Sequence, residues 1–167
     1  MHARFLIGAA VVLVSPVAHA GGTFELSLGG GVVRHRDDAD RTTTRAIFAG
    51  PSFSVGWKHA PKVAVIGRIA FHFHDDTFVH YGAGLQYWPI DRIFLAATAG
   101  VALLDYDQLL PPNITGRSGF GLDLRIGYNL FPDYRHIIHV ALAVSPAVLA
   151  GPEITIPIAI QVGYQYF

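Results

Sequence analysis

The chain has 167 residues, of which 51% are hydrophobic, only 14% are charged and none is cysteine. Twelve basic residues balance twelve acidic ones, which argues against a nucleic-acid-binding protein because such proteins carry a basic excess. The missing cysteine excludes a disulfide framework, a thiolate metal site and a cysteine nucleophile. The charged fraction is well below the roughly 25% of soluble domains. Together with a mean hydropathy of +0.39, it points to a membrane protein.

Residues 1–20 have the order of regions that is typical of a secretory signal peptide. Arg4 supplies a positive start, Phe5 to Val14 form an apolar run, and Ala18-His19-Ala20 matches an A-x-A cleavage site. An N-terminal anchor helix is the alternative, but this apolar run is too short to cross a bilayer. We therefore expect a signal peptide over 1–20 and a single mature domain over 21–167.

The mature chain alternates large apolar residues with small or polar ones in eight successive segments. In chain order they fall within residues 24–32, 47–57, 63–73, 79–87, 93–103, 119–130, 138–144 and 154–166. The last is the clearest, because its even positions are all large: Ile154, Ile156, Ile158, Ile160, Val162, Tyr164 and Tyr166. Side chains of a strand point to alternate faces, so a period of two predicts strands and not helices.

The face opposite the large residues consists mostly of glycine, alanine and serine with few charges. A soluble protein with so bare an exterior would aggregate, so we expect the large residues to face lipid. About ten residues per strand is the length that crosses a bilayer in a tilted barrel, which also pairs every backbone polar group. The pattern predicts an all-β fold, an eight-stranded antiparallel up-and-down transmembrane β-barrel.

Loop lengths give the barrel an orientation. The connections at 58–61, 89–92 and 131–136 are short, whereas those at 34–44 and 105–117 are longer. Outer-membrane barrels have short periplasmic turns and longer extracellular loops, so both ends of the mature chain are expected at the periplasmic side. Aromatic residues near the turns are expected to form an interfacial girdle: Trp57, Tyr87, Trp88, Tyr128, Phe131, Tyr134, Tyr164 and Tyr166.

The signal-like start, the eight segments and the ending Gly163-Tyr164-Gln165-Tyr166-Phe167 resemble the small outer-membrane β-barrel family of Gram-negative bacteria. That family includes the OmpA transmembrane domain, OmpX and OmpW. The resemblance implies a monomer in the bacterial outer membrane, in contact with membrane lipids including lipopolysaccharide. It also implies insertion by the barrel assembly machinery, for which Tyr164, Tyr166 and Phe167 resemble the family's C-terminal signal, although Phe167 is out of phase with the two tyrosines.

Four charged residues lie well inside the expected strands and on the inner face: Glu25, Arg68, Asp123 and Arg125. Their charges sum to zero. Unpaired charges in a narrow, low-dielectric lumen are costly, so we expect these four residues to form pairs across it. A packed polar plug is favoured over a gated ion path, because eight strands leave an interior that side chains just fill.

Three histidines, His72, His74 and His80, are expected on the inner face near the outer mouth. A three-residue loop at Asp75-Asp76-Thr77 would place His80 directly opposite His72. Three imidazoles and two aspartates could ligate zinc or copper. Solvated rim histidines are the alternative, and no other cofactor is expected.

The sequence lacks the signatures of an enzyme. No serine stands two residues after any mature histidine, so the His-x-Ser pair of outer-membrane lipid A deacylases is missing. There is also no G-x-S-x-G and no nucleotide-binding loop. We therefore expect a non-enzymatic barrel with a structural or surface-interaction role. A narrow channel or transporter for ions or small apolar solutes is the alternative, and a lipid-modifying enzyme is a remote one.

Overall fold

A computed structural model describes residues 21–36, 39, 41–74, 76–105, 117–132, 135–151 and 153–167. The expected signal peptide therefore lies outside the described residues. The strands are β1 (Gly22–Arg36), β2 (Thr42–Ala60), β3 (Val63–Phe73), β4 (Thr77–Ile90), β5 (Ile93–Asp105), β6 (Arg117–Pro132), β7 (His136–Val144), β8 (Ala147–Leu149) and β9 (Ile154–Tyr166). Within this part of the chain, no helix is long and apolar enough to cross a membrane.

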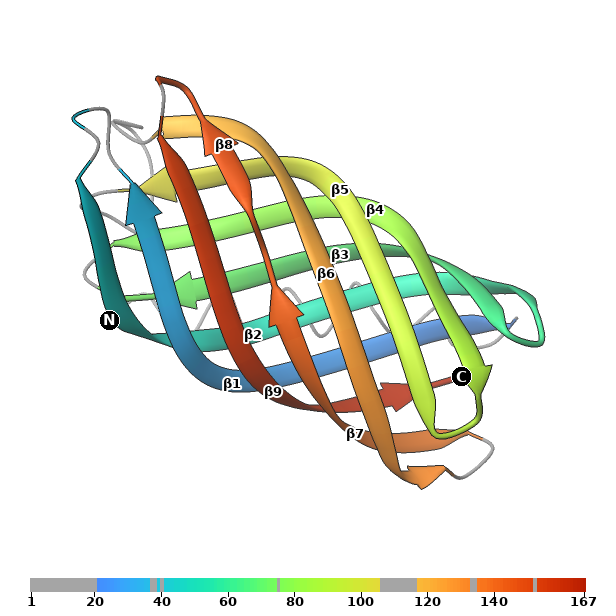
Figure 1. The fold of residues 1–167 in the computed structure, drawn as a ribbon. Helices are drawn as coiled ribbons and strands as arrows, with labels where there is room; N and C mark the ends of the chain where they lie inside the picture. The colour runs from blue at the N-terminus through green and yellow to red at the C-terminus, as the bar shows by residue number, and fades with distance from the viewer. Residues whose placement is uncertain are drawn as a thin grey trace, which may run out of the picture.

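The strands form one closed antiparallel sheet (Figure 1). From β1 to β7 each strand pairs with the next along the chain, and β1 pairs with β9 from Phe24↔Tyr166 to Arg36↔Ile154. Segments β7 and β8 both lie between β6 and β9 in one continuous register, so together they occupy one position in the sheet. The nine segments therefore make an eight-stranded up-and-down barrel, which confirms the predicted fold.

Burial confirms which face is inside. The exposed large residues are those assigned to lipid, such as Leu28, Val65, Leu124 and Val162, while the inner face carries small and polar residues. Because apolar side chains cover the outer wall and the ladders are closed, the barrel meets both demands of a bilayer: an apolar surface and paired backbone groups.

Three large apolar residues lie on the face opposite to the predicted one. The pairing of β2 with β3 shifts between Ala49 and Ser52, at Pro51. The extra residue reverses the side-chain parity, so Ile47 points inward and is 7% exposed, whereas Phe48 points outward and is 52% exposed. Trp88 was assigned to the interfacial girdle, but it lies inside the barrel and is 6% exposed.

The two ends of the barrel differ in how far their strands extend, and the end with tight turns is the short end. Turns at 61–62 and 91–92 close the short end, while β1 and β2 continue to Arg36 and Thr42 at the other. Strand β2 has 19 residues. At about 3.3 Å per residue this is roughly 60 Å along the strand, more than a tilted strand needs to cross the bilayer. The β1–β2 hairpin is therefore longer than a crossing of the bilayer requires, and its extension lies at the end that loop lengths predict to be extracellular.

Candidate functional site

The structure brings the four inner-face charges together in the middle of the lumen. The Arg68 Nε atom lies 2.6 Å from Asp123 Oδ2, and its Nη1 atom lies 3.4 Å from Glu25 Oε1. Arg125 Nη1 forms a close ion pair with Glu25 Oε1, and its Nε lies 3.8 Å from Asp123 Oδ2. All four side chains are buried. Each cation thus meets both anions, so the charges form one neutral network instead of two separate pairs.

Neutral side chains from other strands complete this network. Arg68 donates hydrogen bonds to Ser54 Oγ at 3.1 Å and to Gln161 Oε1 at 3.0 Å. Ser145 Oγ donates to Asp123 Oδ1 at 2.8 Å. The network therefore links strands β1, β2, β3, β6 and β9 with the residue that joins β7 to β8. Sites of this kind tie distant strands to one another, because a buried charge is stable only while its partners stay in place.

A row of glycines continues from Arg68 along the inner face of the barrel. Arg68 pairs with Gly82 on β4, Gly82 with Gly100 on β5, and Gly100 with Gly121 on β6. These three neighbouring inner positions carry no side chain. The buried ring of His80 takes up part of the space that they leave, since a Cβ atom at Gly82 would lie 2.6 Å from its Cε1 atom and one at Gly121 would lie 2.8 Å from its Cδ2 atom.

Apolar side chains fill the lumen on both sides of the ion network. Towards the extracellular end they form one cluster: Phe78, Ala102, Leu104, Ala147 and Leu149. Towards the periplasmic end they form another: Ala64, Ile66, Trp88, Phe94, Ala96 and Ala141, against which Phe167 packs. Beside this second cluster, where Gln86 pairs with Ala64 and Ala96, Gln86 and Gln165 exchange hydrogen bonds at 3.1 Å, and Gln165 donates to Thr23 at 3.0 Å.

His139 is a further part of the network that the sequence analysis did not single out. Its Nε2 atom lies 3.5 Å from Glu25 Oε1, and its ring packs edge-on against Phe94 at 5.0 Å between centroids. The ring is fully buried. The parity of β7 already placed it on the inner face, but its depth in the lumen depends on how β7 is staggered against β1, which alternation does not reveal.

Comparisons with known proteins identify the fold. No family model matches the sequence, and no curated protein matches it. The structure is similar to the crystal structure of Ail, the attachment invasion locus protein of Yersinia pestis, with a TM-score of 0.57, 15% identity, and coverage of 87% of this chain and 99% of that one. Ail in complex with the heparin analogue sucrose octasulfate gives a TM-score of 0.55 at 14% identity, with the same coverage.

A third crystal structure, that of Neisserial surface protein A (NspA), has a TM-score of 0.56 at 10% identity and covers 88% of this chain and 97% of that one. The chain has the fold of the small outer-membrane β-barrels. At these low identities the likeness concerns the fold alone. The fold and the apolar outer wall together indicate a bacterial outer-membrane location.

The three histidines of the predicted metal site are arranged differently from the pairing that the sequence predicted. His72 lies opposite Phe78, and His80 lies opposite Ala70, so the predicted pairing of His72 with His80 is wrong by two residues. The loop begins at His74, which accepts a hydrogen bond from the Asp76 amide at 3.0 Å. The even shift preserves parity, so His72 and His80 both point inward and are buried.

Among the described residues, no group of three histidine, cysteine or acidic side chains is placed to hold a metal ion. Asp75 lies outside them. Zinc or copper binding at His72, His74 and His80 therefore stays a prediction. Calorimetry with zinc on the refolded barrel, compared with a triple-alanine variant, would test it.

The C-terminal residues of the barrel separate into two environments. Tyr164 and Tyr166 stand on the outer side of β9, and the Tyr164 hydroxyl lies 2.6 Å from His136 Nδ1. Phe167 instead turns to the lumen, where its ring meets Trp88 edge-on at 5.2 Å. Its amide donates to the Arg135 carbonyl oxygen at 3.1 Å, which ends the ladder of β9. Phe167 is out of phase with the two tyrosines because it lies, like Gln165, on the inner face.

Proposed function

We propose that this protein is a closed, non-enzymatic barrel of the outer membrane whose extracellular end interacts with its surroundings. The observation that supports this most is the filled lumen. Arg68, Arg125 and their partners occupy its middle, and an apolar cluster fills it on either side. A water-filled path would require breaking the ion network and opening both clusters. Each step is costly in a low-dielectric interior.

Planar-bilayer recording of the refolded barrel tests this proposal. We expect no stepwise conductance at neutral pH, under conditions where a general porin shows clear steps. Insertion is verified separately by protease protection of the membrane-spanning strands. Reproducible steps from the inserted protein would overturn the closed barrel and favour the narrow channel.

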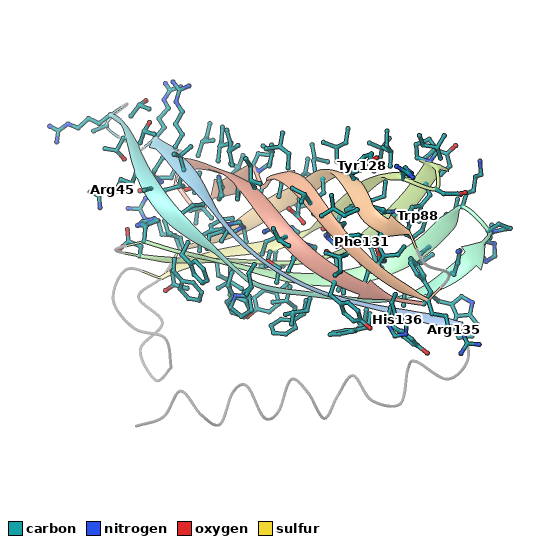
Figure 2. All side chains as sticks on the ribbon, turned by 90° about the horizontal axis from the view of Figure 1, so that it is seen from below. Arg45, Trp88, Tyr128, Phe131, Arg135 and His136 are labelled. Atoms are coloured by element: carbon teal, nitrogen blue, oxygen red, sulfur yellow. The ribbon has the colours of Figure 1, made fainter. Side chains whose placement is uncertain are left out.

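The proposed partner at the extracellular end is lipopolysaccharide. Arg34 and Arg36 follow Leu28 and Val32 in the outward row of β1 and are exposed. The row therefore passes from side chains that contact hydrocarbon to guanidinium groups, which bind phosphate well. Figure 2 shows Arg45, on the neighbouring strand β2, at the same end of the barrel. This arrangement fits the phosphates of lipid A.

A soluble polyanion fits this end less well. Ail is described in complex with a heparin analogue. In the present chain, however, the loops beyond the arginines are acidic in sequence, with Asp37, Asp38, Asp40, Asp75 and Asp76. Their charges would repel a large sulfated chain that approached from solution.

The two partners can be separated with an Arg34→Gln/Arg36→Gln double variant. Wild type should bind vesicles with lipid A more tightly than vesicles with dephosphorylated lipid A, and the double variant should lose that preference. A Lys58→Gln/Lys62→Gln variant removes the same charge at the opposite end and should keep it. Stronger binding to sucrose octasulfate than to lipid A would favour a soluble partner instead.

We further propose that residues 1–20 direct export and that Tyr164, Tyr166 and Phe167 direct insertion by the barrel assembly machinery. Sequencing of the mature N-terminus should give Gly21 as the first residue. A Phe167→Ala variant should reach the outer membrane in lower amount. Its refolding in detergent should be less affected, which separates a recognition role from the packing of Phe167 on Trp88.

A further inference from the structure

The periplasmic end of the outer wall carries a second set of polar groups, on the β5–β6–β7–β9 side. Arg92, in the turn after β4, donates a hydrogen bond to the Tyr128 hydroxyl at 3.0 Å. On the neighbouring strand β7, His136 Nδ1 lies 2.6 Å from the hydroxyl of Tyr164 on β9. Arg135 precedes it and is exposed. Figure 2 shows Tyr128, Phe131, Arg135 and His136 at the end opposite Arg45.

Apolar residues of the outer wall lie between these polar groups. Ile93 pairs with Tyr128 across β5 and β6, and Phe131 pairs with Ile138 across β6 and β7. The pairing of β6 with β7 shifts between Asn129 and Phe131. Phe131 is 67% exposed and stands next to exposed Leu130 and Ile138. We call this surface the inner-rim patch: Arg92, Tyr128, Leu130, Phe131, Arg135, Ile138, His136 and Tyr164.

The charge at this end of the barrel is positive. Lys58, Lys62, Arg92 and Arg135 lie there, and Asp91 is the one acidic side chain among the described residues of this end, with Asp133 lying outside them. The two lysines belong to the β2–β3 side, where Lys58 lies over the Phe167 ring at 4.8 Å and Lys62 donates to the Pro89 carbonyl at 3.1 Å. Arg92 and Arg135 are therefore the two arginines that belong to the inner-rim patch, and the lysines lie outside it.

We propose that the inner-rim patch binds the headgroup of an anionic phospholipid in the periplasmic leaflet, with its acyl chains against Leu130, Phe131 and Ile138. A phosphodiester offers oxygens to the guanidinium groups, which keep free N–H donors beyond the one that Arg92 uses on Tyr128. The Tyr128 hydroxyl accepts from Arg92, so its own proton is left to donate to a phosphate oxygen. Aromatic and cationic side chains at this depth match the headgroup region of a bilayer.

The positive charge favours an anionic headgroup over a zwitterionic one. The ammonium of a phosphatidylethanolamine would be repelled by two arginines, whereas the glycerol of phosphatidylglycerol adds hydroxyl groups and no cation. Electrostatic attraction of anionic lipid to basic residues near a membrane surface is a general effect, worth about one order of magnitude in affinity for one to two cations. The proposal goes beyond the closed barrel, because it concerns the opposite end and the outer wall.

Native mass spectrometry of the refolded barrel tests the proposal. The protein is placed in phosphatidylcholine nanodiscs with a small fraction of phosphatidylglycerol, and the retained lipid is identified after release. We expect wild type to retain phosphatidylglycerol, and an Arg92→Gln/Arg135→Gln variant to retain about tenfold less. A Lys58→Gln/Lys62→Gln variant loses the same charge at the same end but away from the patch, and should retain as much as wild type.

Two further measurements keep the test decisive. Tyr128→Phe removes only the hydroxyl and should lower retention several-fold at constant charge. Glycerol phosphate, which has no acyl chains, should not displace the lipid. Equal losses in the two double variants, no loss in Arg92→Gln/Arg135→Gln, or displacement by glycerol phosphate would each overturn the assignment of a phospholipid to this patch. A gel shift on boiling verifies that every variant is folded.

Discussion

At the scale of residues, the middle of the lumen is occupied by charged side chains whose charges cancel. Two cations and two anions share the middle of the barrel, so no formal charge remains there. Alternation in the sequence placed all four on the inner face, because parity within a strand is a local property. It did not reveal that every cation meets both anions. That arrangement depends on how far each strand is staggered against the others around the closed sheet.

The most sensitive of these residues should be Arg125. Replacing it with alanine leaves Glu25 with Arg68 as its remaining arginine, at 3.4 Å, in a fully buried site. Breaking a buried pair by removing one partner costs about 3–5 kcal/mol, because the remaining charge is poorly compensated. Urea unfolding of the refolded barrel should show a loss of that size. In the Glu25→Ala/Arg125→Ala double variant the loss should be smaller than the sum of the single losses. Additive losses would argue against direct pairing.

Inner-face glycines provide a second residue-scale test. A Cβ atom at Gly121 would lie 2.8 Å from Cδ2 of the buried His80 ring and 3.1 Å from the Ala102 Cβ. Gly121→Val should therefore destabilise the barrel by about 1–3 kcal/mol through overpacking. Gly30 is the matched control, since it faces outward and its Cβ would meet only the Ile47 carbonyl oxygen, at 3.6 Å. Gly30→Val should change the free energy of unfolding by no more than about 0.5 kcal/mol. The same measurement on both variants decides, and equal effects would contradict a filled lumen.

At the scale of elements, the sequence predicted the eight strand positions of the barrel, but not the irregularities within the strands or the extension of β1 and β2 into the expected connection at 34–44. The bulge at Pro51 turned Ile47 inward, and the hairpin after β3 begins at His74 and not at Asp75. Both features depend on backbone conformation at one or two residues. Alternation is insensitive to a shift by two, because such a shift leaves every side chain on its face. Trp88 was misplaced for a related reason: its position next to a turn fits a girdle as well as a lumen, and only its parity with Gln86 distinguishes them.

The interruption between β7 and β8 allows an element-scale prediction. Leu122 donates a backbone hydrogen bond to the Pro146 carbonyl oxygen at 2.9 Å, but proline has no N–H to return the second bond of the pair. Residue 146 lies between β7 and β8 and points outward to lipid, so the change Pro146→Val supplies that donor without altering the lumen. We expect β7 and β8 to become one strand and the free energy of unfolding to rise by about 0.5–1.5 kcal/mol.

Hydrogen exchange at residue 146 and urea unfolding of the same sample check this prediction. Protection of the new amide together with higher stability is the expected result. An unprotected amide would show that the interruption comes from the local backbone path and not from the missing donor.

At the scale of the whole molecule, charge is arranged in three levels. Arginines lie near the extracellular end of the β1–β2 hairpin, a neutral ion network lies in the lumen, and basic residues lie at the periplasmic rim. The two rims are exposed and can meet lipid phosphate, whereas the network is sealed from solvent. Ionic strength should therefore act on the rims and not on the network, since salt screens exposed charges far more than buried ones.

This separation predicts how the folded barrel responds to heat and salt. A closed sheet in which each strand is paired on both sides should stay compact in dodecyl sulfate until heated, and so migrate faster on a gel before boiling than after it. Its circular dichroism spectrum in detergent should be rich in β-structure. The temperature of the gel shift should not change between about 50 and 500 mM sodium chloride, because the ion pairs that cross the lumen are buried. Arg125→Ala should lower that temperature at both salt concentrations. A transition that moves with salt in wild type would place the stabilising charges at the exposed rims, and a helical spectrum or solubility without detergent would contradict the barrel itself.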